Sequence, residues 1–81
     1  MKTVKVSLNT IEKVKSFVNA ITKFDYDFDL VSGRYVIDAK SIMGIFSLDL
    51  GQPIDLNIHS DNAAEVEAVM DVIAPFICEE K

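Results

Sequence analysis

The sequence predicts an α+β fold, an open-faced β-sandwich in which a four-stranded antiparallel sheet carries three helices on one face. Four short segments alternate apolar and polar residues, which is the period of a half-buried strand. Two longer segments repeat apolar residues every three or four positions, and a third segment, 42–48, is a short apolar run. Together with the strands they follow the order β-α-β-β-α-β-α. A chain of 81 residues has room for one core, so we expect a single domain over 1–81.

The first two elements are a strand and a helix. Residues 2–8 alternate apolar and polar side chains, which predicts a strand with one buried face. The apolar residues of 11–24 then recur at helical spacing, which predicts a helix of about fourteen residues. Asn9 or Thr10 can serve as its N-cap.

A hairpin follows the first helix. In residues 26–30 aromatic and aliphatic side chains alternate with carboxylates, and residues 35–39 continue the alternation. Ser32 and Gly33 between the two runs predict a tight turn, because glycine readily adopts positive φ.

The remaining chain predicts a short helix, a fourth strand and a last helix. Ser41 opens an apolar run over 42–48 that is at most two turns long, and residues 54–59 alternate as a strand. Asn62 and Glu65 match a capping box, and Pro75 marks the region where the last helix should end. The polar side chains of the strands should face water on the uncovered side of the sheet; they are Lys5, Asp27, Asp29, Asp38, Asp55, Asn57 and His59.

Composition excludes several classes of function. Eight Lys and Arg against thirteen Asp and Glu leave a net charge of −5, which argues against duplex nucleic acid and anionic membranes as partners. The single cysteine cannot form an internal disulfide, and there is neither a zinc-ligand cluster nor a long apolar segment. We therefore expect a cytoplasmic protein with no metal and no cofactor.

Stand-alone catalysis is also not expected. The sequence has no nucleophile with a neighbouring base and no glycine-rich phosphate loop, so we predict that the protein is not an enzyme. Asp25, Asp27 and Asp29 occupy alternate strand positions, which places their carboxylates in a row instead of a converging cation cage.

One segment carries a resemblance to a known family. Residues 40–48, which read KSIMGIFSL, are similar to the short second helix of HPr, the histidine-containing phosphocarrier of the bacterial phosphotransferase system for sugar transport. The order of elements is also the HPr order, and the resemblance extends over nearly the whole chain. It implies an HPr-like fold.

The resemblance implies two phosphorylation sites. The first is a histidine near the start of the first helix, followed by Ala-Arg-Pro, which exchanges a phosphoryl group with enzyme I and sugar carriers. Counting back without gaps from the KSIMG segment places this histidine at Thr10, the arginine at Glu12 and the proline at Lys13. We therefore predict a variant without the active-site histidine and without catalytic residues. The only histidine, His59, is expected to be a solvated strand residue.

The second implied site is Ser41, the serine that an ATP-dependent kinase phosphorylates in many relatives. Ser41 can equally be a plain N-cap. Of the apolar residues that follow, Ile45 and Leu48 can reach the core, which should leave Ile42, Met43 and Phe46 at the surface. In HPr the matching residues bind protein partners, so the resemblance implies a partner-binding surface here.

Three functions stay open at this point. The first is a regulatory, protein-binding member of the family controlled by phosphorylation at Ser41, with an HPr kinase or a transcriptional regulator as partner. The second is a phosphocarrier with a nonstandard acceptor, Thr10 or His59, and the third is an interaction domain that is never phosphorylated. The sequence does not determine the oligomeric state.

Overall fold

In the computed structural model, which describes residues 2–78, four strands form one antiparallel sheet in the order β1-β4-β2-β3. Their bounds are Lys2–Val6 for β1, Asp27–Ser32 for β2, Tyr35–Asp38 for β3 and Ile54–His59 for β4. All neighbouring strands run antiparallel. The predicted four-stranded antiparallel sheet is confirmed.

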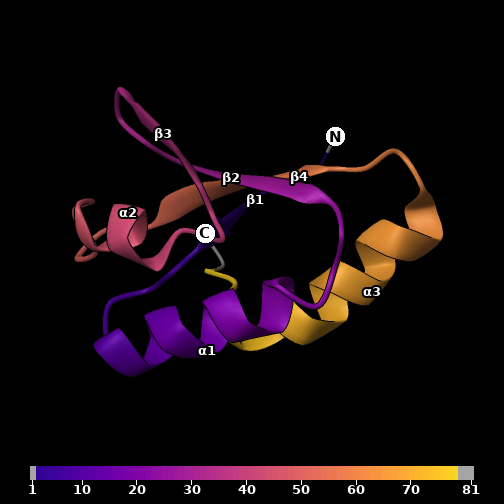
Figure 1. Ribbon diagram of the computed structural model, residues 1–81, viewed down its shortest axis with the longest axis horizontal. Helices are drawn as coiled ribbons and strands as arrows, with labels where there is room; N and C mark the ends of the chain where they lie inside the picture. The colour runs from indigo at the N-terminus through magenta and orange to yellow at the C-terminus, as the bar shows by residue number, and fades with distance from the viewer. Residues whose placement is uncertain (1, 79–81) are drawn as a thin grey trace.

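The helices leave one face of the sheet uncovered. α1 (Ile11–Ile21) and α3 (Ala63–Ile73) lie side by side beneath the sheet, as Figure 1 shows. The short α2 (Ile42–Phe46) contacts both α1 and β3. A 3₁₀ turn over Ala74–Phe76 follows α3, with Pro75 in its first positions, so the α-helix ends where the proline predicts. The open-faced α+β architecture is therefore confirmed.

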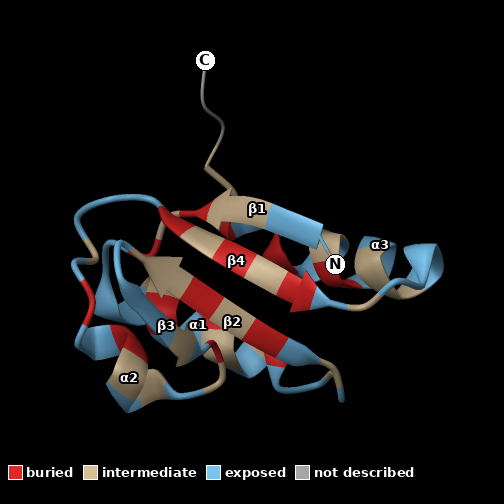
Figure 2. Cartoon of the chain, turned by 90° about the horizontal axis from the view of Figure 1, so that it is seen from above, coloured by how far each residue is buried: buried red, intermediate tan, exposed pale blue. Residues whose placement is uncertain are grey.

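The core lies between the sheet and the helices, and Figure 2 shows its buried positions alternating along β2 and β4. The rings of Phe17 in α1 and Phe76 meet edge to face with centroids 5.7 Å apart. No buried side chain within residues 2–78 is polar or charged. The buried residues are Val6, Leu8, Val14, Phe17, Ile21, Phe28, Leu30, Ala39, Ile45, Leu48, Ile54, Leu56, Ile58, Val69, Ile73 and Phe76.

Several predicted boundaries were wrong. β1 ends at Val6, and Leu8 is buried from the loop that follows it. α1 has 11 residues because the chain turns after Ile21; Phe24 lies beyond the helix and stacks on Tyr26 with ring centroids 5.8 Å apart. Ile11 was expected on the buried face of the helix but is 61% exposed, because it is the first helical residue.

The start of α3 uses two polar side chains in a different arrangement from the predicted capping box. The Asn62 side chain accepts from the backbone N–H groups of Ala64 and Glu65, at 3.0 and 3.2 Å. The Glu65 carboxylate accepts from Ser60 Oγ at 2.8 Å, and its hydrogen bond with Tyr26 raises the pKa of that phenol. The Glu65 carboxylate therefore links α3 to Tyr26, which directly precedes β2, instead of completing the capping box.

The β2–β3 hairpin is closed by a two-residue loop. Ser32 pairs with Tyr35 across the hairpin, and Gly33 occupies the first loop position with φ of +60°. Glycine suits this position because a side chain in the left-handed region clashes with its own backbone. The predicted turn is confirmed.

We expect Gly33→Ala to lower the free energy of unfolding by about 1–2 kcal/mol, the cost of placing a residue with a Cβ in the left-handed region. The matched control is Gly51→Ala, since Gly51 has no positive φ and an added Cβ would meet only the Asp49 side chain, at 3.3 Å. Urea denaturation of both variants measures the difference. Equal stability of the two variants would contradict the assigned turn.

Polar pairs cross the open face of the sheet. Thr3 Oγ1 donates to Asn57 Oδ1 at 2.8 Å, and Lys5 Nζ contacts Asp55 Oδ1 at 3.0 Å. Each pair joins β1 to β4 directly across the register. Such exposed pairs contribute little to the free energy of unfolding, about 0–1 kcal/mol each. This face of the sheet is therefore exposed to water and does not form a second core.

None of the helices within residues 2–78 is long and apolar enough to cross a membrane.

Candidate functional site

Ser41 is the N-cap of α2. Its backbone is extended, with φ −92° and ψ 98°, and its exposed hydroxyl accepts from the backbone N–H of Gly44 at 3.3 Å. A Cβ on Gly44 would lie 3.2 Å from Ser41 Oγ and 3.4 Å from Ile37 Cδ1. Glycine thus leaves room for the serine hydroxyl between α2 and β3. The predicted capping role of Ser41 is confirmed.

The apolar residues that follow Ser41 divide between core and surface. Ile45 and Leu48 are buried, as predicted, while Met43 is 77% and Phe46 39% exposed. Ile42 was expected at the surface but is half-buried and packs against the core, because it lies one turn before Ile45 on the same face of α2. The exposed apolar surface of α2 therefore consists of Met43 and Phe46.

The lysine beside Ser41 is held elsewhere. Lys40 Nζ donates to the backbone carbonyl of Phe24 at 2.6 Å and lies 5.5 Å from the centroid of the Phe28 ring. The Lys40 backbone N–H donates to Asp38 Oδ1 at 2.9 Å. This ammonium thus anchors the loop before α2 to β2 and to the residues that precede β2.

Thr10 is the N-cap of α1, the position to which the family histidine was assigned. Its Oγ1 accepts from the backbone N–H of Lys13 at 3.1 Å. Glu12 is exposed in the first turn, where a carboxylate suits the helix dipole. A cavity of about 610 Å³ lies here, lined by Thr10, Glu12, Lys13, Ser16, Pro75 and Phe76.

The start of α1 lies at the same end of the molecule as α2, as Figure 1 shows. The two helices are in contact. The two predicted site regions are thus brought to one end. Ile11, exposed beside Thr10, was missed as a surface residue. The only feature of the sequence that could have predicted its exposure is its position directly after the N-cap. The first residue of a helix is often not covered by the core that buries the later turns.

His59 lies at the other end of the sheet, where β4 ends (Figure 1). Its Nε2 is 2.5 Å from Asp29 Oδ2, so it is paired and not merely solvated. The pair borders a cavity of about 370 Å³ on the open face, which Asp27, Phe28 and Asp38 also line. Despite these carboxylates, no group of three His, Cys, Asp or Glu within residues 2–78 could hold a metal ion.

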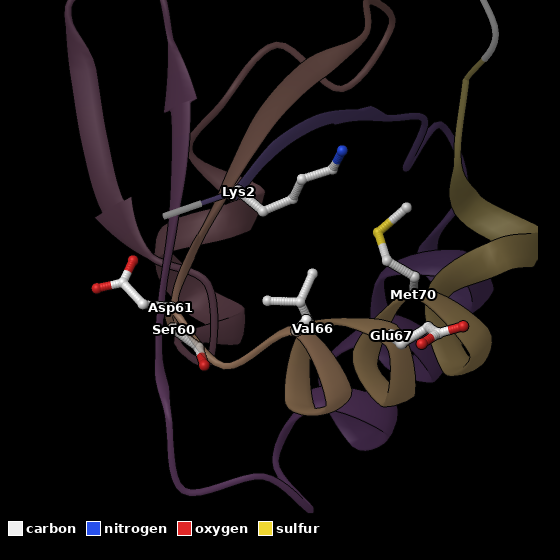
Figure 3. Close-up of a pocket in the computed structure, with 7 residues that line it drawn as sticks. Lys2, Ser60, Asp61, Val66, Glu67 and Met70 are labelled. Carbon is white, nitrogen blue, oxygen red and sulfur yellow. The ribbon is translucent and has the colours of Figure 1, made fainter.

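A further cavity of about 400 Å³ lies between the start of β1 and α3. In Figure 3 Lys2 extends over Val66 and Met70, which form an apolar floor, while Glu67 points outward. None of the predicted site residues lines this cavity.

An exposed serine at the N-cap of a short helix, beside apolar side chains on an open-faced α+β scaffold, is the arrangement that the resemblance to HPr predicts. Residues 12–77 match the family model described as "PTS HPr component phosphorylation site". The chain belongs to the HPr family of the phosphotransferase system, whose members are phosphocarriers rather than catalysts.

Solved structures agree with this assignment. HPr-C-His of Thermoanaerobacter tengcongensis is 28% identical with a TM-score of 0.72, and the alignment covers 100% of both chains. The phosphocarrier protein HPr of Bacillus anthracis str. Ames is 31% identical over 88% of this chain and 92% of that one, with a TM-score of 0.67. Crh of Bacillus subtilis, described as a swapped dimer, shares the fold at 24% identity over 94% and 90% of the chains, with a TM-score of 0.61.

Proposed function

We propose that this protein is a regulatory, protein-binding member of the HPr family without histidine phosphocarrier activity, controlled by phosphorylation at Ser41. One observation carries the proposal: the Ser41 hydroxyl is exposed at the start of α2, on the same short helix as the exposed Met43 and Phe46. A kinase can reach this oxygen, and a partner that binds the helix would contact the modified group.

A phosphate on Ser41 is compatible with the fold. The free backbone N–H groups at the start of a helix favour an anion there, and Gly44 N–H already faces the serine oxygen. The phosphate would add about two negative charges next to Met43 and Phe46. Docking of a partner on this apolar surface would then depend on whether the partner offers a cation, which is how the modification would select between partners. An HPr kinase and a transcriptional regulator are the two kinds of partner that fit.

Loss of the phosphocarrier activity is supported by the residues at the start of α1. Phosphoryl transfer requires a nucleophile that is active near neutral pH and donors that hold the phosphate. Thr10 offers an unactivated hydroxyl, and the Glu12 carboxylate would repel the phosphoryl group. His59 does not replace them, because it lies where β4 ends, at the other end of the sheet from the start of α1.

The test is intact-mass analysis after incubation with an HPr serine kinase and ATP, and in parallel with enzyme I and phosphoenolpyruvate. We expect one phosphate on the wild type in the first reaction and none in the second. Ser41→Ala should remain unmodified. Ser47→Ala is the matched control, since Ser47 is an exposed serine at the other end of α2 and donates to the Gly44 carbonyl.

Each reaction can contradict a different part of the proposal. If the wild type stays unmodified in the kinase reaction, regulation through Ser41 is ruled out. The remaining function would be that of an interaction domain that is never phosphorylated. A phosphate acquired from enzyme I, and lost in Thr10→Ala or His59→Gln, would instead identify a phosphocarrier with a nonstandard acceptor.

A further inference from the structure

The outer edge of β3 has no strand beside it. β1 and β3 are the two edge strands of the sheet, and at the β1 edge Ile77 forms an antiparallel bridge with Val6. Within residues 2–78 no comparable segment pairs with the outer side of β3. Open strand edges present backbone donors and acceptors that can pair with another chain.

The register determines which backbone groups of β3 point outward. In a hairpin with a two-residue loop, the residues that flank the loop, here Ser32 and Tyr35, exchange hydrogen bonds. The bonds then alternate, and the Ala39 N–H donates to the Phe28 carbonyl at 2.9 Å in agreement with that alternation. The N–H and C=O groups of Val36 therefore point away from β2.

Two large apolar side chains of this edge strand are exposed, one on each face of the sheet. Tyr35 is 70% and Val36 62% exposed. Both belong to the hairpin that projects from the body of the molecule in Figure 1. Burial in the core does not explain these side chains, and they lie outside the Met43 and Phe46 surface proposed to bind regulatory partners.

The charged side chains near the β3 edge of one copy would complement those of a second copy. Asp38 lies directly opposite Asp29 in the register, which is an unfavourable pair of like charges. Asp29 has His59 as a partner. The only arginine of the chain, Arg34, lies at the hairpin loop four residues before Asp38. An antiparallel arrangement of two copies brings Arg34 of each copy towards Asp38 of the other, whereas a parallel arrangement would bring like charges together.

We propose that two copies of this chain pair antiparallel through their β3 edges, about a two-fold axis at Val36. In this register the Val36 residues of the two copies exchange backbone hydrogen bonds with each other. Arg34 of each copy then lies opposite Asp38 of the other, at a distance that long side chains can bridge. The two four-stranded sheets would form one continuous sheet.

The other end of β3 limits the length of the contact. The Asp38 carbonyl already accepts the backbone N–H of Ser41 at 2.9 Å, and α2 contacts β3. The chain therefore turns across the edge at Asp38. Backbone pairing with a second copy is confined to Val36, so the contact is short and should be weak.

Sedimentation velocity from about 10 µM to 1 mM protein tests the proposal, because a short interface predicts a Kd in the range of about 0.1–1 mM. Val36→Lys should raise the Kd at least about tenfold, since it places a charge at the centre of the contact. The control Val72→Lys adds the same charge at an exposed valine of α3 and should dimerise like the wild type. Far-UV circular dichroism checks that both variants fold.

Charge reversal tests the register. Arg34→Asp alone and Asp38→Lys alone should each remain monomeric, because like charges then face each other. An equimolar mixture of the two variants should dimerise, since both contacts in the mixed pair are attractive. A wild type that stays monomeric at 1 mM, or a Val36→Lys variant that dimerises as well as the wild type, would overturn the proposal.

Discussion

Replacing Phe17 by alanine is expected to lower the free energy of unfolding by about 3–5 kcal/mol, the usual cost of removing a phenyl group from a core. Phe17 is fully buried in the middle of α1, and its ring meets Phe76 edge to face with centroids 5.7 Å apart. The aromatic contact adds about 0.5–1.5 kcal/mol beyond the area that the ring buries.

The loss should be nearly as large as the total stability of the domain. Globular proteins have about 5–15 kcal/mol of stability, and a chain of this length belongs near the lower end because small domains bury a smaller fraction of their surface. We therefore expect Phe17→Ala to be largely unfolded at moderate urea concentrations where the wild type is folded. Urea denaturation followed by circular dichroism gives the value.

Phe46→Ala is the matched control, because it removes the same phenyl group from an exposed position of α2. It should cost less than about 1 kcal/mol. Equal losses in the two variants would mean that Phe46 is buried and would remove it from the proposed partner-binding surface.

The strands could be predicted from the sequence because a strand with one buried face has a period of two. That pattern placed residues 54–59 as a strand, and β4 has those bounds. The ends of the elements were harder to predict, because an apolar residue can reach the core from a loop as well as from a strand or a helix. Leu8 and Phe24 both do so, and each lengthened the predicted element beyond its true end.

The candidate site also has features that the local sequence predicts and features that depend on the fold. The capping role of Ser41 is a local property, since it needs only a serine before an apolar helical run. The pairing of His59 with Asp29 depends on the register of β2 against β4, in which Asp29 faces Asn57 and His59 faces Asp27. A shift by one residue would send one of the two side chains to the other face, so no local pattern predicts the contact.

Transplanting the family motif should create phosphocarrier activity. We expect the variant with Thr10→His, Ile11→Ala, Glu12→Arg and Lys13→Pro to accept one phosphate from enzyme I and phosphoenolpyruvate, while the wild type accepts none. The N-cap of α1 is exposed, so a histidine there is accessible and lies at the positive end of the helix dipole. Proline in the first turn is tolerated, although it removes the N–H that Thr10 now accepts. Intact-mass analysis measures the addition.

The comparison of smaller changes separates the two parts of the motif. Thr10→His alone retains Glu12, whose carboxylate repels the incoming phosphoryl group, and should be modified much more slowly than the full variant. Adding His59→Gln to the full variant should change nothing, because His59 is at the other end of the sheet. If the full variant folds and still accepts no phosphate, the four residues are not sufficient for phosphocarrier activity. The proposal that they account for its absence would then be wrong.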